Sequence, residues 1–139
     1  MEYVYRSRRR ENCVQLRRAH PLVPLDATQR VPIDMALYEQ IKSRASTPLA
    51  HFVEQVFASK AEMIRMGFYF AQDPLAAAAL ANPAVVTFRP EAIDVSDHTG
   101  EEARTLELKG KNHRANAQVA VDADNLRFRD VFLTALGVR

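Results

Sequence analysis

The sequence has one cysteine, no tryptophan and only four glycines in 139 residues. A single cysteine, Cys13, excludes an internal disulfide framework and any CxxC metal site, and it indicates a reducing, cytoplasmic setting. No apolar run approaches the roughly 18 residues that a membrane-spanning helix needs, and the N-terminus lacks the apolar stretch of a secretory signal. We therefore expect a cytoplasmic protein with no membrane partner.

Several chemical motifs are also missing. The glycines form no GxGxxG or P-loop pattern, and no GxSxG segment exists. The histidines do not pair at helical spacing and have no neighbouring ligand cluster; they stand at positions 20, 51, 98 and 113. The sequence therefore gives no support for a standard nucleotide-phosphate site, a serine-hydrolase site or a zinc site.

What is present is the composition of an ordinary globular chain, with 47% hydrophobic and 26% charged residues. The length fits one small domain with one core, or a piece of a larger domain.

Positive charge is concentrated at the front. Residues 1–18 hold six arginines and two glutamates, a net of +4, whereas the remaining 13 basic and 15 acidic residues give −2. We therefore separate a basic segment, residues 1–20, from a domain over residues 21–139. Arginines can bind phosphates by charge alone, but no recognised nucleic-acid module follows, and a solvated terminus is the simpler interpretation. Nucleic acid is not the expected partner.

The first half of the domain predicts helices. A short apolar run at 22–25 is broken by prolines and predicts an edge strand or an extended entry segment. Proline then opens an expected helix over 32–45. Thr47, as an N-cap before a proline, predicts a second helix over 48–66, which Gly67 is expected to end or bend.

The second half predicts strands and a last helix. Alternating apolar residues predict strands near 85–88, 92–95, 105–108 and 117–121, with turn composition at 97–100 and a polar loop at 109–114. Asp124 is expected to cap a helix that ends at Gly137. The order is helices first, then a group of short strands, then one helix.

Between these halves lies an Asp-Pro start signal at Asp73, followed by a nearly all-alanine helix over 75–81 that Asn82 and a proline should stop. On its residue type alone, Asp73 is interpreted as an N-cap that accepts hydrogen bonds from free backbone N–H groups.

Three segments, in order, resemble the inosine–uridine preferring nucleoside hydrolase family. The Asp-Pro-Leu-Ala sequence at 73–76, after a helix ending near Gly67, looks like the family's C-terminal part. The sequence Leu-Val-Pro-Leu-Asp-Ala-Thr at 22–28 resembles its PLDVT segment. Asn-Ala-Gln-Val-Ala-Val-Asp at 116–122 resembles its N-x-x-V-A-x-D strand and precedes the expected helix with Phe128 and Phe132.

The resemblance implies an α/β fold, a mixed sheet flanked by helices, of which residues 21–139 are the C-terminal half. It also implies a homo-oligomer that hydrolyses the N-glycosidic bond of ribonucleosides to ribose and free base, in purine and pyrimidine salvage. Family members hold calcium with an N-terminal D-x-D-x-x-x-D-D cluster and one C-terminal aspartate, which Asp73 matches. Calcium suits carboxylate and hydroxyl oxygens and can activate a water.

The sequence departs from the family pattern in two ways that argue against full activity. The D-x-D-x-x-x-D-D cluster is absent from the sequence, and one aspartate cannot make a shell of six to eight oxygens. Many family members have a histidine before the metal aspartate as general acid, whereas Gln72 has no titratable proton near neutral pH. We therefore expect the isolated chain to be inactive or impaired.

Other residues near Asp73 have two interpretations. In the family this stretch borders the base pocket, so Gln72, Arg65 and Tyr69 are candidate substrate-binding residues. Alternatively, Arg65 is a solvated helix residue and Tyr69 is partly buried packing.

The basic segment has no counterpart in the family, which suggests a truncated or frame-shifted reading of a longer gene. A different class of function also stays open, namely a non-catalytic α/β module that self-associates through uncovered apolar helix faces.

Overall fold

The structure is a computed structural model that describes residues 20–96, 100, 104–110 and 113–138. It confirms the α/β class, with helices first, then strands, then one helix. The elements in chain order are β1 (His20–Leu22), α2 (Leu25–Thr28), α3 (Met35–Arg44), α4 (Pro48–Ser59), α5 (Ala61–Arg65), α6 (Gln72–Ala81), the 3₁₀ helix η2 (Pro83–Val85), β2 (Val86–Glu91), β3 (Ile93–Val95), β4 (Thr105–Glu107), β5 (Ala117–Ala123) and α7 (Asn125–Leu136).

The chain divides into two compact units. One takes the described residues of Met1–Leu22 and Phe88–Val119, and the other, the helical unit, takes the described residues of Val23–Thr87 and Ala120–Arg139. Apart from His20, the basic segment over 1–20 lies outside the described residues, as does most of the turn expected at 97–100. Among the described residues, no helix is both long and apolar enough to cross a membrane.

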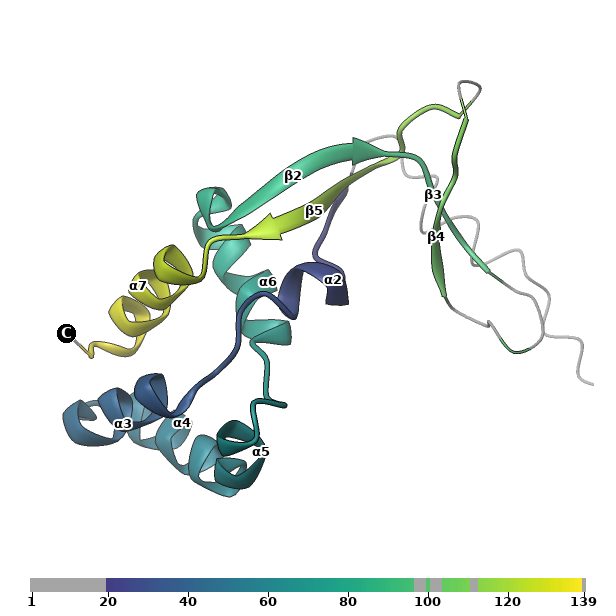
Figure 1. Cartoon of the computed structure of the whole chain (residues 1–139). Coiled ribbons are helices and arrows are strands. Elements are labelled where there is room, and N and C mark those ends of the chain that lie inside the picture. The colour runs from purple at the N-terminus through teal and green to yellow at the C-terminus, as the bar shows by residue number, and fades with distance from the viewer. Residues whose placement is uncertain (1–19, 97–99, 101–103, 111–112, 139) are drawn as a thin grey trace, which may run out of the picture. The chain divides into compact units, whose positions relative to one another are not determined.

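The strands form a small mixed sheet in the order β1-β5-β2. Strand β1 is parallel to β5, with His20 opposite Ala117, and it is an edge strand as expected, although it ends at Leu22 and α2 begins at Leu25. The arrows of β2 and β5 point in opposite directions (Figure 1). Backbone bonds at the two ends of this pair, Asp124 N to Val85 O and Asn116 N to Glu91 O, fit that antiparallel direction.

A second pair of strands, β3 and β4, forms an antiparallel hairpin next in the chain. The side chain of Asn116 binds both backbone polar groups of Ile93, the first residue of β3. Its Oδ1 accepts from the Ile93 amide at 2.9 Å and its Nδ2 donates to the Ile93 carbonyl at 2.9 Å. The side chain thus bonds Ile93 as a neighbouring strand would.

The helix expected from Pro32 begins later. Residues 31–33 are instead extended and pair antiparallel with residues 69–71, through bonds from Ile33 N to Tyr69 O (2.9 Å) and from Ala71 N to Val31 O (3.0 Å). Pro32 faces Phe70 between these two bonds, a place where the missing N–H of proline is not needed. The helix α3 then starts at Met35, with Asp34 as its N-cap.

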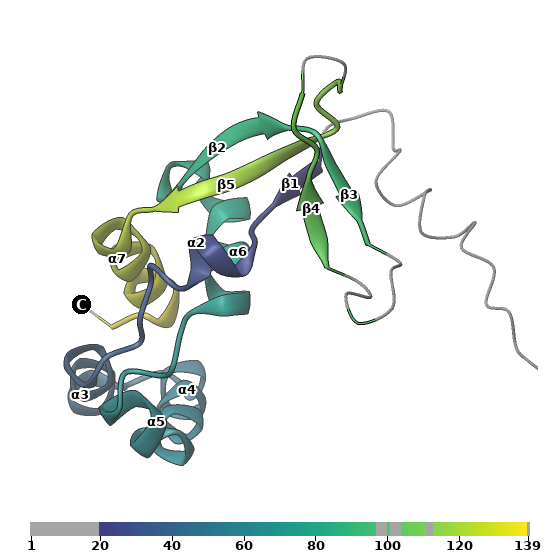
Figure 2. The same ribbon diagram turned by 45° about the vertical axis from the view of Figure 1, so that its right-hand side comes forward.

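The single helix expected over 48–66 is wrong in one respect, because it breaks at Lys60. The Ser59 hydroxyl donates to the Val56 carbonyl, and the Lys60 amide bonds the Phe57 carbonyl, three residues back instead of four. Lys60 adopts φ −112° and ψ 10°, and α5 starts after it. Figures 1 and 2 show α3, α4 and α5 gathered as a group within the helical unit.

Glycine ends two helices as expected. Gly67 has φ 76°, and its amide and that of Phe68 return to the carbonyls of Ile64 and Met63. Gly137 has φ 71° and ends α7 in the same way. Both are Schellman motifs, in which a left-handed residue satisfies the last carbonyls of the helix.

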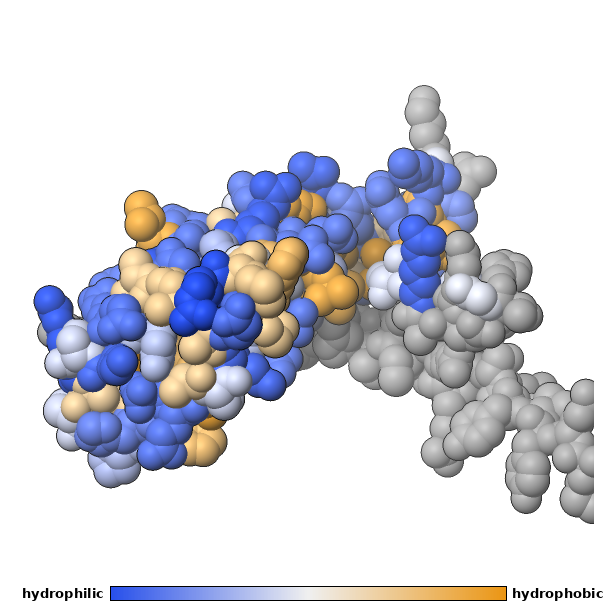
Figure 3. Space-filling model, turned by 60° about the horizontal axis from the view of Figure 1, so that its bottom comes forward, coloured by the Kyte–Doolittle hydropathy of each residue, from blue (hydrophilic) through white to orange (hydrophobic). Residues whose placement is uncertain are grey.

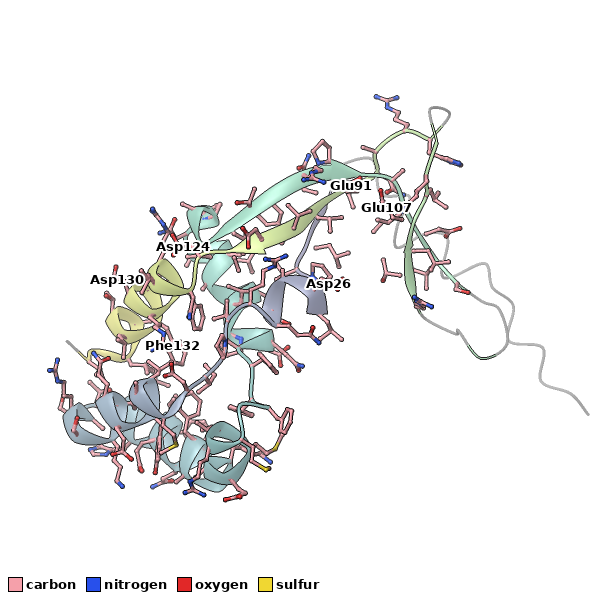
Figure 4. All side chains as sticks on the ribbon, viewed as in Figure 1. Asp26, Glu91, Glu107, Asp124, Asp130 and Phe132 are labelled. Atoms are coloured by element: carbon pink, nitrogen blue, oxygen red, sulfur yellow. The ribbon has the colours of Figure 1, made fainter. Side chains whose placement is uncertain are left out.

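Aromatic rings join α4 to α7 in the helical unit. Phe132 stacks on Phe57 with centroids 6.3 Å apart and on the fully buried Phe128 at 5.4 Å. In Figure 4, Phe132 points from α7 toward the group that contains α4. Thr47 adds a polar link, because its hydroxyl caps the Ala50 amide and donates to the carbonyl of Leu136 at 2.9 Å.

Asp34 ties α3 to α7 in the same unit. Its Oδ1 accepts from the Leu37 amide at 2.9 Å, and its Oδ2 accepts from the guanidinium of Arg129. Partial burial would raise the pKa of Asp34, but the hydrogen bonds from Arg129 and Leu37 outweigh it and hold the pKa below its usual value of 3.8. A lowered folded pKa means that this stabilisation is present above about pH 4 and is lost as the pH falls through the folded pKa.

We predict that Asp34→Ala lowers the free energy of unfolding at pH 7 by about 2 kcal/mol, since it removes both a cap and a charge-assisted bond. Asp34→Asn keeps the cap, because asparagine is also a strong N-cap residue, and should cost about half as much. Urea unfolding of the three proteins at pH 7 and pH 3 checks this. Equal losses for the two variants at pH 7, or a loss undiminished at pH 3, would contradict the role of the ion pair.

Candidate functional site

The candidate site lies at the start of α6, where the predicted N-cap role of Asp73 is wrong. The N-cap is Ala71, and no side chain caps this helix end. The first four-residue bond runs from Leu75 N to Ala71 O, so Pro74 is the third helical residue and Asp73 the second. Proline is tolerated at this third position, because the amides of the first helical turn have no partner within the helix and the missing N–H of Pro74 therefore costs no hydrogen bond.

The backbone before this helix is fixed by the pairing of residues 69–71 with 31–33. Val31, Ile33 and Ala71 are all buried, and Ala71 is both a strand partner and the N-cap. The direction in which α6 leaves is therefore set by a buried ladder, and the side chains of Gln72 and Asp73 come one and two residues after it.

Gln72 and Asp73 are both exposed. Within the described chain, the Asp73 carboxylate forms no hydrogen bond or ion pair, and it does not cap the helix. It stands in the first turn, where the partial positive charge of the helix end favours an anion by a few tenths of a kcal/mol. The geometry leaves both carboxylate oxygens of Asp73 open to a ligand.

Arg65 and Tyr69 are positioned differently from that pair. Arg65 is exposed on α5, and its guanidinium pairs with Glu62 one turn earlier. Tyr69 is half-buried and meets the ring of Phe57 edge-on, with centroids 6.0 Å apart. These contacts show solvated and packing roles, and a substrate role for either residue stays a prediction.

The residues present do not fit a calcium ion by themselves. No group of three or more His, Cys, Asp or Glu side chains that could hold a metal exists among the described residues. In Figure 4, the carboxylates of Asp26, Asp124 and Asp130 in the helical unit lie apart from one another. Asp73 therefore supplies at most one ligand of such a site.

The other resembling segments have structural contacts. Asp122 forms an ion pair with Arg30 at 3.4 Å, and both side chains are more than half exposed, so the pair contributes little. Thr28 is buried and its hydroxyl donates to the Leu25 carbonyl. No structural role is predicted for Asn116 from the sequence, whereas in the structure its side chain binds the backbone of Ile93. The only signal in the sequence is that Asn116 stands directly before an alternating strand.

We predict that Asp73→Ala changes the free energy of unfolding by less than about 0.5 kcal/mol, because Asp73 makes no cap bond. Asp124→Ala is the matched control. Asp124 caps α7 through the Arg127 amide at 3.0 Å, and that bond lowers the pKa of Asp124, so Asp124→Ala should cost clearly more than Asp73→Ala. Thermal unfolding of both variants decides the point, and an equal loss in the two would restore a capping role for Asp73.

Comparison with known proteins gives a structural answer only. No protein-family model and no curated protein sequence matches the chain. Among solved structures, a purine-preferring ribonucleoside hydrolase from Gardnerella vaginalis matches with a TM-score of 0.66 and 23% identity, over 85% of this chain and 39% of that one. An inosine-uridine preferring nucleoside hydrolase from Bacillus anthracis matches with a TM-score of 0.74 and 22% identity, over 89% and 38%.

A plant nucleoside hydrolase gives a TM-score of 0.73 at 16% identity, over 87% of this chain and 42% of that one. The chain thus spans about two fifths of the length of the proteins it matches. The fold expected from the resembling segments is confirmed: this chain has the fold of part of a nucleoside hydrolase.

Proposed function

We propose that this chain is the C-terminal part of a ribonucleoside hydrolase, an enzyme that cleaves the N-glycosidic bond to give ribose and free base. The observation that carries the proposal is the open carboxylate of Asp73 on a rigidly placed helix start, in a chain with this partial fold. The backbone before Asp73 is fixed by the ladder, and its carboxylate has no partner in the described chain, so the carboxylate is available to a ligand.

Asp73 would be one calcium ligand, completed by aspartates that the chain does not supply. The described residues contain no metal-binding group, so the hydrolytic step depends on residues from elsewhere. The contribution of this chain is to fix the position of one carboxylate and of the side chain before it.

Gln72 would act beside the departing base. Its amide can donate and accept hydrogen bonds, which suits the edge of a nucleobase, but it cannot transfer a proton near neutral pH. The base would therefore leave without a proton from this position, or would receive it from another group, and hydrolysis would be slow. Tyr69 and Arg65, on the chain just before this site, are proposed to border the same ligand.

We expect the isolated 139 residues to show no turnover of inosine or uridine in calcium, and turnover to appear when a segment with the D-x-D-x-x-x-D-D cluster is added. The segment to try is the part of the Bacillus anthracis enzyme that the match with this chain does not cover. Asp73→Asn should abolish the restored activity, whereas Asp130→Asn, a change at an exposed aspartate on α7, should not. Release of free base, followed by chromatography, measures both.

Robust turnover by the isolated chain would show that the added aspartates are not required. Restored activity that survives Asp73→Asn would remove Asp73 from the metal site.

A separate prediction concerns Gln72. In the restored enzyme, Gln72→His should raise kcat by about 10² to 10⁴, because it introduces a general acid next to Asp73. The gain should fall away at a pH above the histidine pKa, whereas a purely structural effect would not change with pH. A kcat that is unchanged by Gln72→His at all pH values would show that position 72 does not face the leaving base.

A further inference from the structure

The segment that runs from α5 into α6 (Figures 1 and 2) presents three polar side-chain groups without a partner in the described chain. They are the hydroxyl of Tyr69, the amide of Gln72 and the carboxylate of Asp73. Gln72 and Asp73 are exposed. Tyr69 is half-buried, but no buried side-chain oxygen of the described residues lacks a partner, so its hydroxyl also reaches the surface. All three groups are therefore open to a ligand.

This segment offers a ligand no unpaired positive charge. Arg65, the nearest cationic residue before it in the sequence, is paired with Glu62 one turn earlier. The side chains of Tyr69 and Gln72 are neutral groups, and an aromatic ring is a favourable neighbour for a ligand cation. The surface of the helical unit is mixed in the same way on the face that Figure 3 shows, where hydrophilic and apolar side chains lie side by side. A positively charged part of a ligand therefore meets no repulsion from these side chains.

The side chains proposed to border the ligand also include no proton donor suited to neutral pH. An amide has no ionisable proton, a guanidinium keeps its proton in proteins, and a phenol releases its proton only far above neutral pH. A general acid works best when its pKa lies near the working pH. Residues of the types found at positions 65, 69 and 72 therefore do not supply a proton to a departing base.

The need for that proton depends on the charge of the substrate. Water adds its oxygen to the anomeric carbon of the ribose while the bond from that carbon to the base nitrogen breaks, and the electron pair of the bond goes to the nitrogen. A neutral base such as that of uridine then leaves as an anion unless it is protonated. A base whose glycosidic nitrogen is already positively charged leaves as a neutral molecule, and the one proton released comes from the attacking water.

We propose that the preferred substrates of this site are ribosides of cationic bases, in which the glycosidic nitrogen carries a positive charge. Ribosylpyridinium is the simplest member of this class. The inference rests on the proposed function, because it concerns the same bond and the same site, and it adds the chemical class of the leaving base. Gln72 then contacts a base that requires hydrogen bonds but no proton.

The test uses the restored enzyme, in which the full chain is combined with the part of the Bacillus anthracis enzyme that the match does not cover. Ribosylpyridinium and uridine are compared as substrates, since the base of each is a single six-membered ring. At about pH 6, where a histidine is partly protonated, kcat/KM should be at least about 100-fold higher for ribosylpyridinium, the factor that a missing general acid costs uridine.

The variant Gln72→His separates this preference from the intrinsic reactivity of the two substrates. It should raise kcat for uridine by about 10² to 10⁴ and change kcat for ribosylpyridinium by less than about threefold, because only the base of uridine needs the proton. Gln72→Asn, which exchanges one neutral amide for another, is the matched control and should raise neither rate. Position 72 is exposed, so these substitutions do not disturb the core.

Two results would overturn the substrate class alone: a kcat/KM for uridine that equals or exceeds that for ribosylpyridinium, or an equal gain for both substrates in Gln72→His. A restored enzyme that hydrolyses neither substrate, nor inosine, would overturn the proposed function and the substrate class with it. Turnover of uridine without turnover of ribosylpyridinium would leave the proposed function standing and remove the inference.

Discussion

The short ladder between residues 31–33 and 69–71 is the constraint on which the helical unit and the candidate site both depend. It joins segments almost forty residues apart, and its buried side chains exclude water from its two backbone bonds. On one side the chain continues directly into Asp34, the cap of α3. On the other it continues into Gln72 and Asp73. One ladder thereby places a structural carboxylate and an unpartnered one, each within two residues of its end.

Three aspartates stand at helix starts in this chain, and Asp73 differs from the other two because it does not cap its helix. Asp34 and Asp124 each accept a backbone amide three residues later, and for each of them that bond helps to hold the pKa below its usual value. Asp73 stands at a helix start of the same kind, but Ala71 has already taken the cap position. A helix that begins one residue before its aspartate, with no side-chain cap, gains little from that carboxylate, so helix capping does not explain the residue.

Local sequence signals predict the exact starts of α4 and α7 but not those of α3 and α6. Thr47 and Asp124 were identified as caps because each stands directly before its helix, and Gly67 and Gly137 because only a left-handed residue closes these helix ends well. Pro32 was misread because a proline before an apolar run is compatible with a helix start and also with the unbonded position of a ladder. Its partner, Phe70, lies 38 residues away, and no local pattern specifies that pairing. The same ladder moved the start of α6, so the error at Asp73 has the same origin as the error at Pro32.

The apolar residues of α4 and α5 show what periodicity alone does not distinguish. The apolar residues from Leu49 to Met66 appear in the sequence as one broad helix face, and a broad face suggests only deeper burial. In the structure the residues separate into a core stripe with Phe57 and Ile64 and an exposed stripe with Phe52 and Met63. A single core explains only the first stripe. The second stays exposed in the described chain, and a broad apolar pattern alone does not predict that exposure.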